Sequence, residues 1–437
     1  MKKYFISGAM LAGLMSLAAC SNDEGVVADN NGAEQQFTIT LASSGDRATR
    51  AAADRTLESE AAGQSIEKVT LVVRSQDDNK VVYIHTLDNW NDTATDYNTN
   101  GHGKKLTFTI PKADKLGAGS YVVTAVGYNE GNYNLKLPAK GDVVDKNITA
   151  ITPADAEAKE VFAGEQEFTV KDGKIDGTDG SKAIQSVDVT LHRQVAGAYG
   201  YFTSIPAKIG ETDVASIRMV SRSKNTVLTF GSFNRSFTTT DANVMYMVNG
   251  SVPAGKTAKF LNGDEANVLF SAKITDWFPG GDKNNDGVYD KKDTNWTKHY
   301  SGSYLKGSVF ASNFIVPFSA TEGKSTLELQ LLDATGNVLY AWPVKLDASN
   351  DQIGKTGETA SANLSDPITA MGFAETADVF SLFRNHIYSI GIHKQGTTNP
   401  DKTEPGTDQP TDLSKIQNVV IRVNDNWEAM HHMSIDE

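Results

Sequence analysis

Apolar residues alternate with polar ones in many short stretches of the chain, and Gly, Asn, Asp or Pro residues separate these stretches. Phe37, Ile39 and Leu41 alternate with Thr38 and Thr40, and the pattern recurs along the chain. A period of two places the apolar side chains on one face of a strand, whereas a helix needs a period near 3.6. The other predicted strands are 69–73, 106–110, 121–128, 187–191, 308–318, 325–332, 337–346 and 387–392. Many short strands with turns between them predict an all-β fold of two tandem antiparallel β-sandwich domains.

Changes in composition divide the 437 residues into segments. The Gly- and Asp-rich stretch 171–182 is the clearest internal boundary. It predicts an N-terminal domain over 51–182 and a C-terminal domain over 183–394. Residues 395–415 contain three prolines and few apolar side chains, and they predict a flexible linker of about 20 residues with a reach of roughly 60 Å. A final short strand and tail occupy 416–437.

Cys20 is the only cysteine of the chain, and it closes a stretch typical of a lipoprotein signal over residues 1–20. Lys2 and Lys3 precede an apolar stretch that ends at Leu17, and Ala18-Ala19 stand directly before the cysteine. This stretch is shorter than the about 20 apolar residues that a membrane span needs. We therefore expect Cys20 to carry lipid and to tether the precursor to a bacterial outer membrane. The alternative is an ordinary signal peptide with an incidental cysteine.

The same residue counts exclude several classes of protein. With one cysteine, the chain has neither a disulfide framework nor a cysteine-ligated metal site. The formal net charge of −13 argues against nucleic acid and against anionic membrane surfaces as partners. No sequence pattern of a hydrolase, metalloprotease or nucleotide-binding enzyme occurs, so we expect no catalysis.

Two candidate strands lie at opposite ends of the chain. The first holds Phe37, Ile39 and Leu41, and the second holds Val419, Ile421 and Val423. The second has no neighbouring strand in the sequence, and an isolated strand is unstable in water. It therefore needs a partner from elsewhere, either its own domain or another copy of the chain.

An arginine-bearing segment follows the first strand. Residues 21–50 form a polar propeptide that carries this strand and ends in small residues with Arg47 and Arg50, and Arg55 follows. Small residues in an exposed segment favour proteolysis, and we prefer Arg50 because three alanines follow it. A cut there removes the first strand and leaves a sheet with an open edge, which recruits another strand.

The order of these features resembles the Bacteroidales fimbrillins, or type V pilins. The resemblance rests on the cysteine at the end of the signal, the arginine segment, the run Leu191-His192-Arg193-Gln194-Val195-Ala196, the strand Arg384-Asn385-His386-Ile387-Tyr388-Ser389-Ile390 and the C-terminal strand. Gly197 departs from the basic residue that often follows this run in the family. The family resemblance covers nearly the whole chain.

This resemblance implies two transthyretin-like sandwich domains, export as a lipoprotein and cleavage by an Arg-specific protease. It also implies polymerisation by donor-strand exchange, in which Val419, Ile421 and Val423 enter a neighbouring copy and replace its first strand. Because the chain has both the cleavage segment and the extension, we expect a stalk subunit of a surface fimbria. Tip and anchor subunits are then partners, and a tip or anchor role for this chain is an alternative.

One loop has the spacing of a calcium-binding loop. Oxygen-bearing residues at intervals that wrap a hard cation, with Gly287 at the sharp turn, make it a possible calcium site. The candidate ligands are Asp282, Asn284, Asp286, Val288, Asp290 and Asp293. A solvated loop of Asp, Asn and Gly residues without a cation is the alternative.

A different class of function stays open, a surface lipoprotein that binds glycans. β-Sandwich modules of that kind display aromatic platforms to sugars. The candidate platforms are Trp90, Trp277, Trp296 and Trp427.

Overall fold

The computed structural model shows an all-β protein, and the predicted all-β fold class is confirmed. The prediction of purely antiparallel sheets is wrong, because β1 (Gln36–Leu41) pairs parallel with β11 (Ser186–Arg193) and β12 (Ala196–Thr203) pairs parallel with β23 (Ile387–Ile390). It describes residues 35–41, 66–96, 104–129, 131, 133–144, 148–151, 158–176, 186–222, 227–230, 267–300, 303–318, 327–346, 382, 387–391, 393, 408–415, 421–422 and 433–434. Among these residues, none of the helices has the length and hydropathy of a membrane span. Cys20, Arg47, Arg50, Val419 and Val423 lie outside the described residues.

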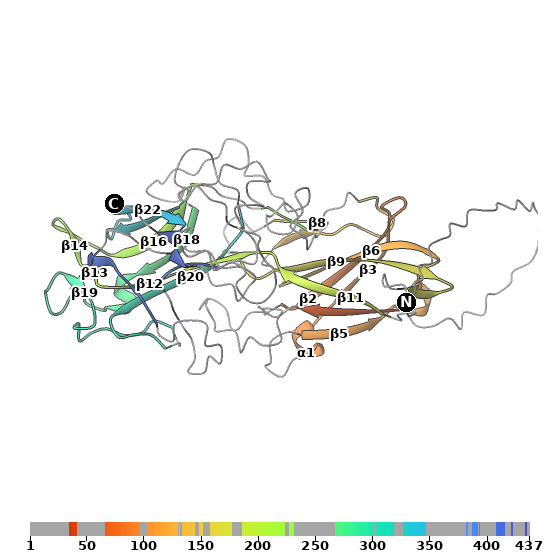
Figure 1. Ribbon diagram of the computed structural model, residues 1–437, viewed down its shortest axis with the longest axis horizontal. Helices are drawn as coiled ribbons and strands as arrows, with labels where there is room; N and C mark the ends of the chain where they lie inside the picture. Colours follow the sequence, from red (N-terminus) through yellow and green to blue (C-terminus); the bar gives the residue numbers. More distant parts are fainter. Residues whose placement is uncertain are drawn as a thin grey trace, which may run out of the picture.

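The first large sheet takes its strands from the N-terminal half of the chain (Figure 1). Among the described residues its order is β3 (Val81–Leu87), β2 (Lys68–Ser75), β6 (Gly119–Tyr128), β9 (Phe162–Lys171), β11 (Ser186–Arg193), β1 (Gln36–Leu41), β5 (Lys104–Thr109) and β4 (Thr95–Asp96), with β10 (Lys174–Asp176) on β9. The ladder between β11 and β9 involves only His192 and Arg193. The path therefore turns at that point into two layers that face each other, β3-β2-β6-β9 and β11-β1-β5-β4.

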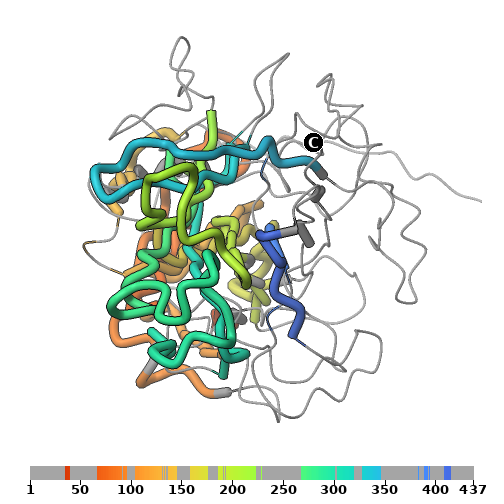
Figure 2. The backbone as a smooth tube through the Cα atoms, turned by 90° about the vertical axis from the view of Figure 1, so that its left-hand side faces the viewer, coloured from red at the N-terminus to blue at the C-terminus, as the bar shows by residue number. Residues whose placement is uncertain are grey.

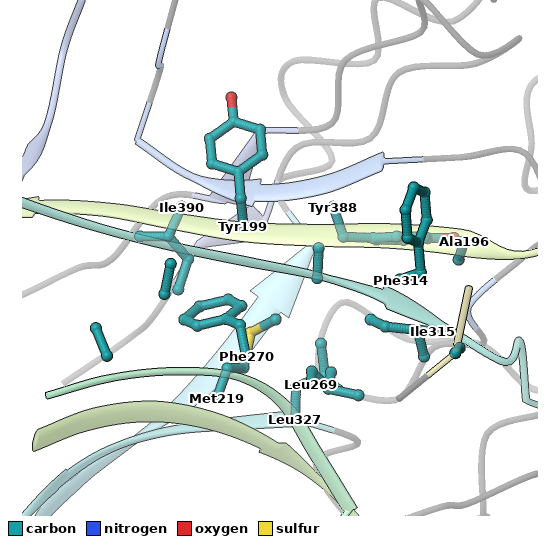
Figure 3. Close-up of a cluster of buried hydrophobic side chains, with 14 of the residues drawn as sticks. Ala196, Tyr199, Met219, Leu269, Phe270, Phe314, Ile315, Leu327, Tyr388 and Ile390 are labelled. Atoms are coloured by element: carbon teal, nitrogen blue, oxygen red, sulfur yellow. The ribbon is translucent and has the colours of Figure 1, made fainter. Parts of the chain in front are cut away.

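The second large sheet takes its strands from residues 196–434. Its order is β18 (Asn267–Lys273), β16 (Ser216–Ser221), β21 (Leu327–Leu332), β22 (Val338–Leu346), β26 (Met433–Ser434), β25 (Ile421–Arg422), β23 (Ile387–Ile390), β12 (Ala196–Thr203) and β20 (Ser308–Ile315), with β24 (Thr411–Asp412) on β12. Figure 2, seen from the end that carries this sheet, shows it in front of the first. Figure 3 shows apolar side chains such as Met219, Phe270 and Ile315 meeting in its core.

Smaller elements complete the described structure. The remaining strands are β7 (Asn134–Lys136), β8 (Ile148–Ile151), β13 (Ile205–Pro206), β14 (Lys208–Ile209), β15 (Thr212–Asp213), β17 (Val227–Phe230) and β19 (Val288–Tyr289). The helices are single turns: α1 (Trp90–Thr93), α3 (Ile274–Trp277), η1 (Lys112–Asp114) and η3 (Leu413–Lys415). The predicted strands at 69–73, 106–110, 121–128, 187–191, 308–318, 325–332, 337–346 and 387–392 correspond to β2, β5, β6, β11, β20, β21, β22 and β23.

The Gly- and Asp-rich stretch that predicted a domain boundary contains a hairpin turn of the first sheet. β9 and β10 pair antiparallel with Lys171 opposite Lys174. The two turn residues, Asp172 and Gly173, have φ values of 52° and 72°, as a two-residue Asp-Gly hairpin requires. The next strand, β11, still pairs with β1 and β9, so a boundary between residues 182 and 183 is wrong. The chain passes from the first sheet to the second between Arg193 and Ala196.

This crossing is a buried connection. The Arg193 guanidinium forms a salt bridge with Glu160 (Nη2 to Oε1, 2.6 Å), and both side chains are almost fully buried. Arg193 also lies over the ring of Phe162, 5.0 Å from its centroid. Gln194 donates its backbone N–H to the Val161 carbonyl at 2.8 Å. The Leu191–Ala196 run, one of the motifs on which the family resemblance rests, therefore joins the two sheets.

Part of the predicted flexible linker is docked on the second sheet. β24 pairs parallel with β12, Phe202 lying opposite Thr411 (Figure 2, blue). Leu413 is 2% exposed and belongs to the core of that sheet. The prediction of a flexible linker over 395–415 is therefore wrong for residues 408–415, because one aliphatic side chain and a short ladder attach them.

Candidate functional site

The first predicted end strand, β1, lies inside the first sheet between two partners. It pairs parallel with β11, where Phe37 lies opposite Val187, and antiparallel with β5, where Phe37 lies opposite Phe108. Both ladders run over all six residues without a break in register. We name the position between β5 and β11 the β1 site.

The alternation in β1 decides which side chains it buries. Phe37 and Ile39 are fully buried, and Phe37 meets Phe168 of β9 edge to face at 5.5 Å between centroids. Val189 of β11 lies opposite Ile39 and is also fully buried. Leu41 ends the strand opposite Leu191. Burying a Phe and an Ile contributes about 1.5 to 3 kcal/mol each, so β1 is a well-packed strand of the core.

Gln35, directly before β1, extends the inward-facing set with a polar side chain. It is fully buried. Its Nε2 donates to the Leu116 carbonyl at 2.9 Å, and its Oε1 accepts from the Leu116 N–H at 2.8 Å. The backbone carbonyl of Gln35 accepts from the Ile110 N–H at 2.9 Å. Our sequence reasoning missed Gln35, although its position two residues before Phe37 places it on the same face.

The other face of β1 carries a small hydroxyl cluster. Thr38 Oγ1 lies 2.6 Å from the Ser186 hydroxyl and 3.2 Å from the Thr107 hydroxyl. The three side chains belong to β1, β11 and β5, so they join all three strands on this face. Thr38 is 5% exposed, and its hydroxyl is therefore a buried group with partners.

Removal of β1 would leave part of the first sheet without ladder partners. In the strand order of the described residues, β5 and β4 reach the rest of the sheet only through β1. Without β1, both β5 and β11 expose a row of unpaired N–H and C=O groups. Such edges pair readily with another strand.

Of the second predicted end strand, the structure describes only Ile421 and Arg422. Ile421 and Arg422 form β25, which pairs with β23 through Ile390 and Ser389. β25 also pairs with β26 through Ile421 and Met433. In the described residues this segment therefore pairs within its own chain, as the alternative of a strand folded back on its own domain requires.

The predicted calcium loop holds its oxygens against backbone N–H groups. Asp282 accepts from the N–H groups of Asn285 and Gly287, each at 2.8 Å. Asp293 is fully buried and accepts from Lys283 and from Asp290 at 2.8 and 3.0 Å. These bonds hold the loop in its turns.

A lysine lies among the remaining candidate ligands. Lys292 Nζ is 2.6 Å from Asp286 Oδ2 and 3.6 Å from Asp290 Oδ2. Its hydrogen bond lowers the pKa of the Asp286 carboxyl. Among the described residues, no group of three or more His, Cys, Asp or Glu side chains is arranged to hold a metal ion. Calcium binding here stays a prediction.

Two of the tryptophans considered as sugar platforms are core residues. Trp90 is fully buried, and Trp277 is 1% exposed within a group of aromatic side chains that includes Tyr300 and Tyr304. Trp296 is half-buried and donates its Nε1–H to the Ser308 carbonyl at 2.8 Å. Trp427 lies outside the described residues. Surface platforms at Trp90 and Trp277 are therefore wrong, because each side chain fills a core.

No family model and no curated protein matches the chain. The chain is similar to several solved structures, which include the fimbrial anchor protein Mfa2 from Porphyromonas gingivalis, at 10% identity and a TM-score of 0.33, covering 91% of this chain and 99% of that one. The tip fimbrial protein Mfa3 from the same organism has 10% identity and a TM-score of 0.31, with 82% and 94% covered. A fimbrial assembly protein from Parabacteroides distasonis has 12% identity and a TM-score of 0.33, with 92% and 99% covered. All three are described as fimbrial proteins.

Proposed function

We propose that this protein is a stalk subunit of a bacterial surface fimbria that polymerises by donor-strand exchange. The observation that carries the proposal is the position of β1, which is the only ladder connection between β5 and β11 in the described residues. Only another strand can supply the two ladders of backbone hydrogen bonds that β1 forms in that position. The arginine segment follows it closely in the sequence.

Cleavage changes how β1 is held. Arg47 and Arg50 come six and nine residues after Leu41, the last residue of the strand. A cut at either arginine leaves β1 attached to the body by non-covalent contacts alone. The lipid on Cys20 departs with the same fragment, so the lipid serves delivery and the mature subunit contains no cysteine.

The C-terminal extension supplies the replacing strand. Its docked root, β24 and η3, lies on the second sheet, whereas the β1 site belongs to the first. A contact between two different surfaces of identical copies does not close on itself, so it repeats into a filament. Neighbouring copies, anchor and tip subunits and an Arg-specific protease are then the partners, and the filament supports adhesion.

The glycan-binding alternative is weakened, because two of its four candidate tryptophans, Trp90 and Trp277, are buried in the core. A tip subunit would not need the extension, and an anchor subunit would keep its lipid. The retention of both the arginine segment and the extension therefore favours the stalk.

The mass of the protein extracted from the cell surface tests the proposal. We expect a chain that starts at Ala51, or at Ala48 if Arg47 is cut. An intact lipidated Cys20 on the surface protein would contradict the stalk role. In a second test, deletion of residues 416–437 should abolish the ladder of high-mass, heat-labile polymers, and persistence of that ladder would contradict donor-strand exchange.

A further inference from the structure

The two end strands share a longer pattern than three aliphatic residues. At the first end, Gln35, Phe37 and Ile39 are the buried residues, and Leu41 continues their spacing in the sequence. At the other end, the residues at the same spacing are Gln417, Val419, Ile421 and Val423. Each set is one glutamine followed by three apolar side chains at every second position. Both sets run in the same direction along the chain.

The glutamine determines the register of a replacing strand better than the apolar residues do. An aliphatic side chain fits several buried positions, whereas a buried amide needs the one position where its hydrogen-bond partners lie. Gln35 satisfies both the N–H and the C=O of Leu116, a residue that lies in neither large sheet. A replacing strand without an amide at this position leaves these two buried groups without partners. A buried N–H or C=O group without a partner destabilises the strand that leaves it so.

We infer that Gln417 of a neighbouring copy takes the place of Gln35, so that the donor strand enters parallel to β11 in one register. This inference rests on the proposed function and gives its strand direction and pairing. Val419 then occupies the place of Phe37, Ile421 that of Ile39 and Val423 that of Leu41. On the opposite face, Val420 takes the place of Thr38 between β5 and β11.

The other arrangements place unsuitable side chains in buried positions. In the reverse direction with the same three apolar residues inward, Asp425 lies at the place of Gln35, and a carboxylate cannot donate to the Leu116 carbonyl. A shift by one residue turns Arg422 toward the core. A shift by two residues in one direction puts Gln417 against Phe168, and in the other it puts Val419 beside Leu116. Each arrangement loses the amide pair or buries a polar group without a partner.

The docked root of the extension agrees with entry at this end of the site. Leu413 is fixed in the core of the second sheet, and Gln417 follows it by four residues, a reach of about 14 Å in an extended chain. The Gln35 end of the next copy's β1 site must therefore lie close to η3 of the donor. Because only residues 414–416 separate Leu413 from Gln417, the donor strand can shift its register only slightly.

Cysteine cross-linking reads the register directly, because the mature subunit has no cysteine of its own. Thr107 lies opposite Thr38, and their hydroxyl oxygens are 3.2 Å apart. The pair Thr107→Cys with Val420→Cys should therefore give polymers that resist SDS and heat after mild oxidation and fall apart on reduction. The control pairs combine Thr107→Cys with Asn418→Cys or with Arg422→Cys, and we expect far less cross-linking from them.

The cross-linking results distinguish a wrong register from a failure of donor-strand exchange itself. A cross-linked ladder from the Asn418 pair indicates a shift by two residues. One from the Arg422 pair indicates the opposite shift or the reversed direction. Either result overturns the register, as does a polymer in which none of the three pairs cross-links. If the cut wild-type chain forms no polymer under the same conditions, donor-strand exchange itself has failed, and the register with it.

The dissociation rate of the polymers tests the role of Gln417. Gln417→Leu keeps the size of the side chain but removes both hydrogen bonds to Leu116, so its polymers should dissociate roughly tenfold faster or more. Asn418→Ala is the matched control, since position 418 faces the other side of the strand. Equal dissociation rates for Gln417→Leu and wild-type polymers would contradict the assignment of the amide.

Discussion

The two end strands have different partners in the described residues. β1 pairs over six residues with each of two neighbours and buries Phe37 and Ile39 completely. In the described residues, Ile421 and Arg422 of β25 pair with β23, and Ile421 pairs with Met433 of β26. The strand that we propose to leave is therefore firmly held in the precursor. Weak binding of β1 cannot drive the exchange, so the cut is needed to turn a tethered strand into a dissociable peptide.

The side chains of the two strands also differ in size. Phe37 fills the space beside Phe168, whereas the proposed register brings the smaller Val419 to that place. If this register is correct, the polymer has a poorer fit at this position than the precursor. Substitutions at matched positions of the two strands can test whether this contrast holds.

The largest effect is expected from Phe37→Ala in the uncut chain. Loss of this buried ring should lower the free energy of unfolding by about 3 to 5 kcal/mol, as measured by urea denaturation. Ile421→Ala in β25 is the control and should cost much less. Because residues 1–50 leave on cleavage, polymers of the cut Phe37→Ala chain should match wild-type polymers. A weakened polymer would mean that β1 stays in the mature subunit.

Val419→Phe should have a smaller effect of the opposite sign on the polymer. If the donor residue lies beside Phe168, the larger side chain restores buried apolar area and stabilises each donor contact by about 1 kcal/mol. The temperature at which the SDS-resistant ladder disappears measures this, and Val420→Phe on the other face is the control. An unchanged or lower temperature for Val419→Phe would place the residue elsewhere.

Thr38→Val imitates the donor inside the precursor, because Val420 takes this place in the polymer. The variant loses the hydroxyl that contacts Ser186 and Thr107, which should cost about 0.5 to 1.5 kcal/mol in a urea titration of the uncut chain. The mature polymer should be unaffected. A cost as large as that of Phe37→Ala would mean that the hydroxyl cluster, and not the apolar face, holds β1.

The smallest effect is expected far from both strands, in the β21–β22 turn. Hydrogen bonds from Thr335 and Asn337 lower the pKa of Asp333 to about 2. A depressed carboxyl pKa stabilises the fold above the ordinary value of 3.8, and this contribution is lost as the pH falls toward 2. Asp333→Ala should therefore lower Tm slightly at pH 7 and not at pH 2, equally in precursor and mature subunit. A difference that persists at pH 2 would mean that the charge of Asp333 is not what stabilises the turn.

Local patterns predicted the strands well and their partners poorly. Alternation identified β1, β2, β5 and β11 from the sequence, because burial on one face imposes a period of two. The position of β1 between β5 and β11 could not be predicted, since both ladders join residues distant in the sequence. Gln35 was missed because a polar residue before an apolar stretch is usually a solvent-exposed end.

The errors in segment boundaries have a similar origin. Asp172-Gly173 marks a turn, and composition alone does not distinguish a turn inside a sheet from a boundary between domains. Residues 408–415 have the composition of a linker, yet Leu413 attaches them to a core that is built elsewhere in the chain. In both segments the structure depends on a few tertiary contacts, which cannot be predicted from local composition.

Amide hydrogen exchange in β5 and β11 tests the replacement of β1 most directly. It should be measured on the uncut chain, on the cut chain that lacks residues 416–437 and has been separated from its 1–50 fragment, and on the polymer of the cut full chain. We predict protected amides in the uncut chain, fast exchange in the truncated cut chain and restored protection in the polymer. Protection that persists in the truncated cut chain, or that does not return in the polymer, would contradict the replacement of β1 by the extension of a neighbouring copy.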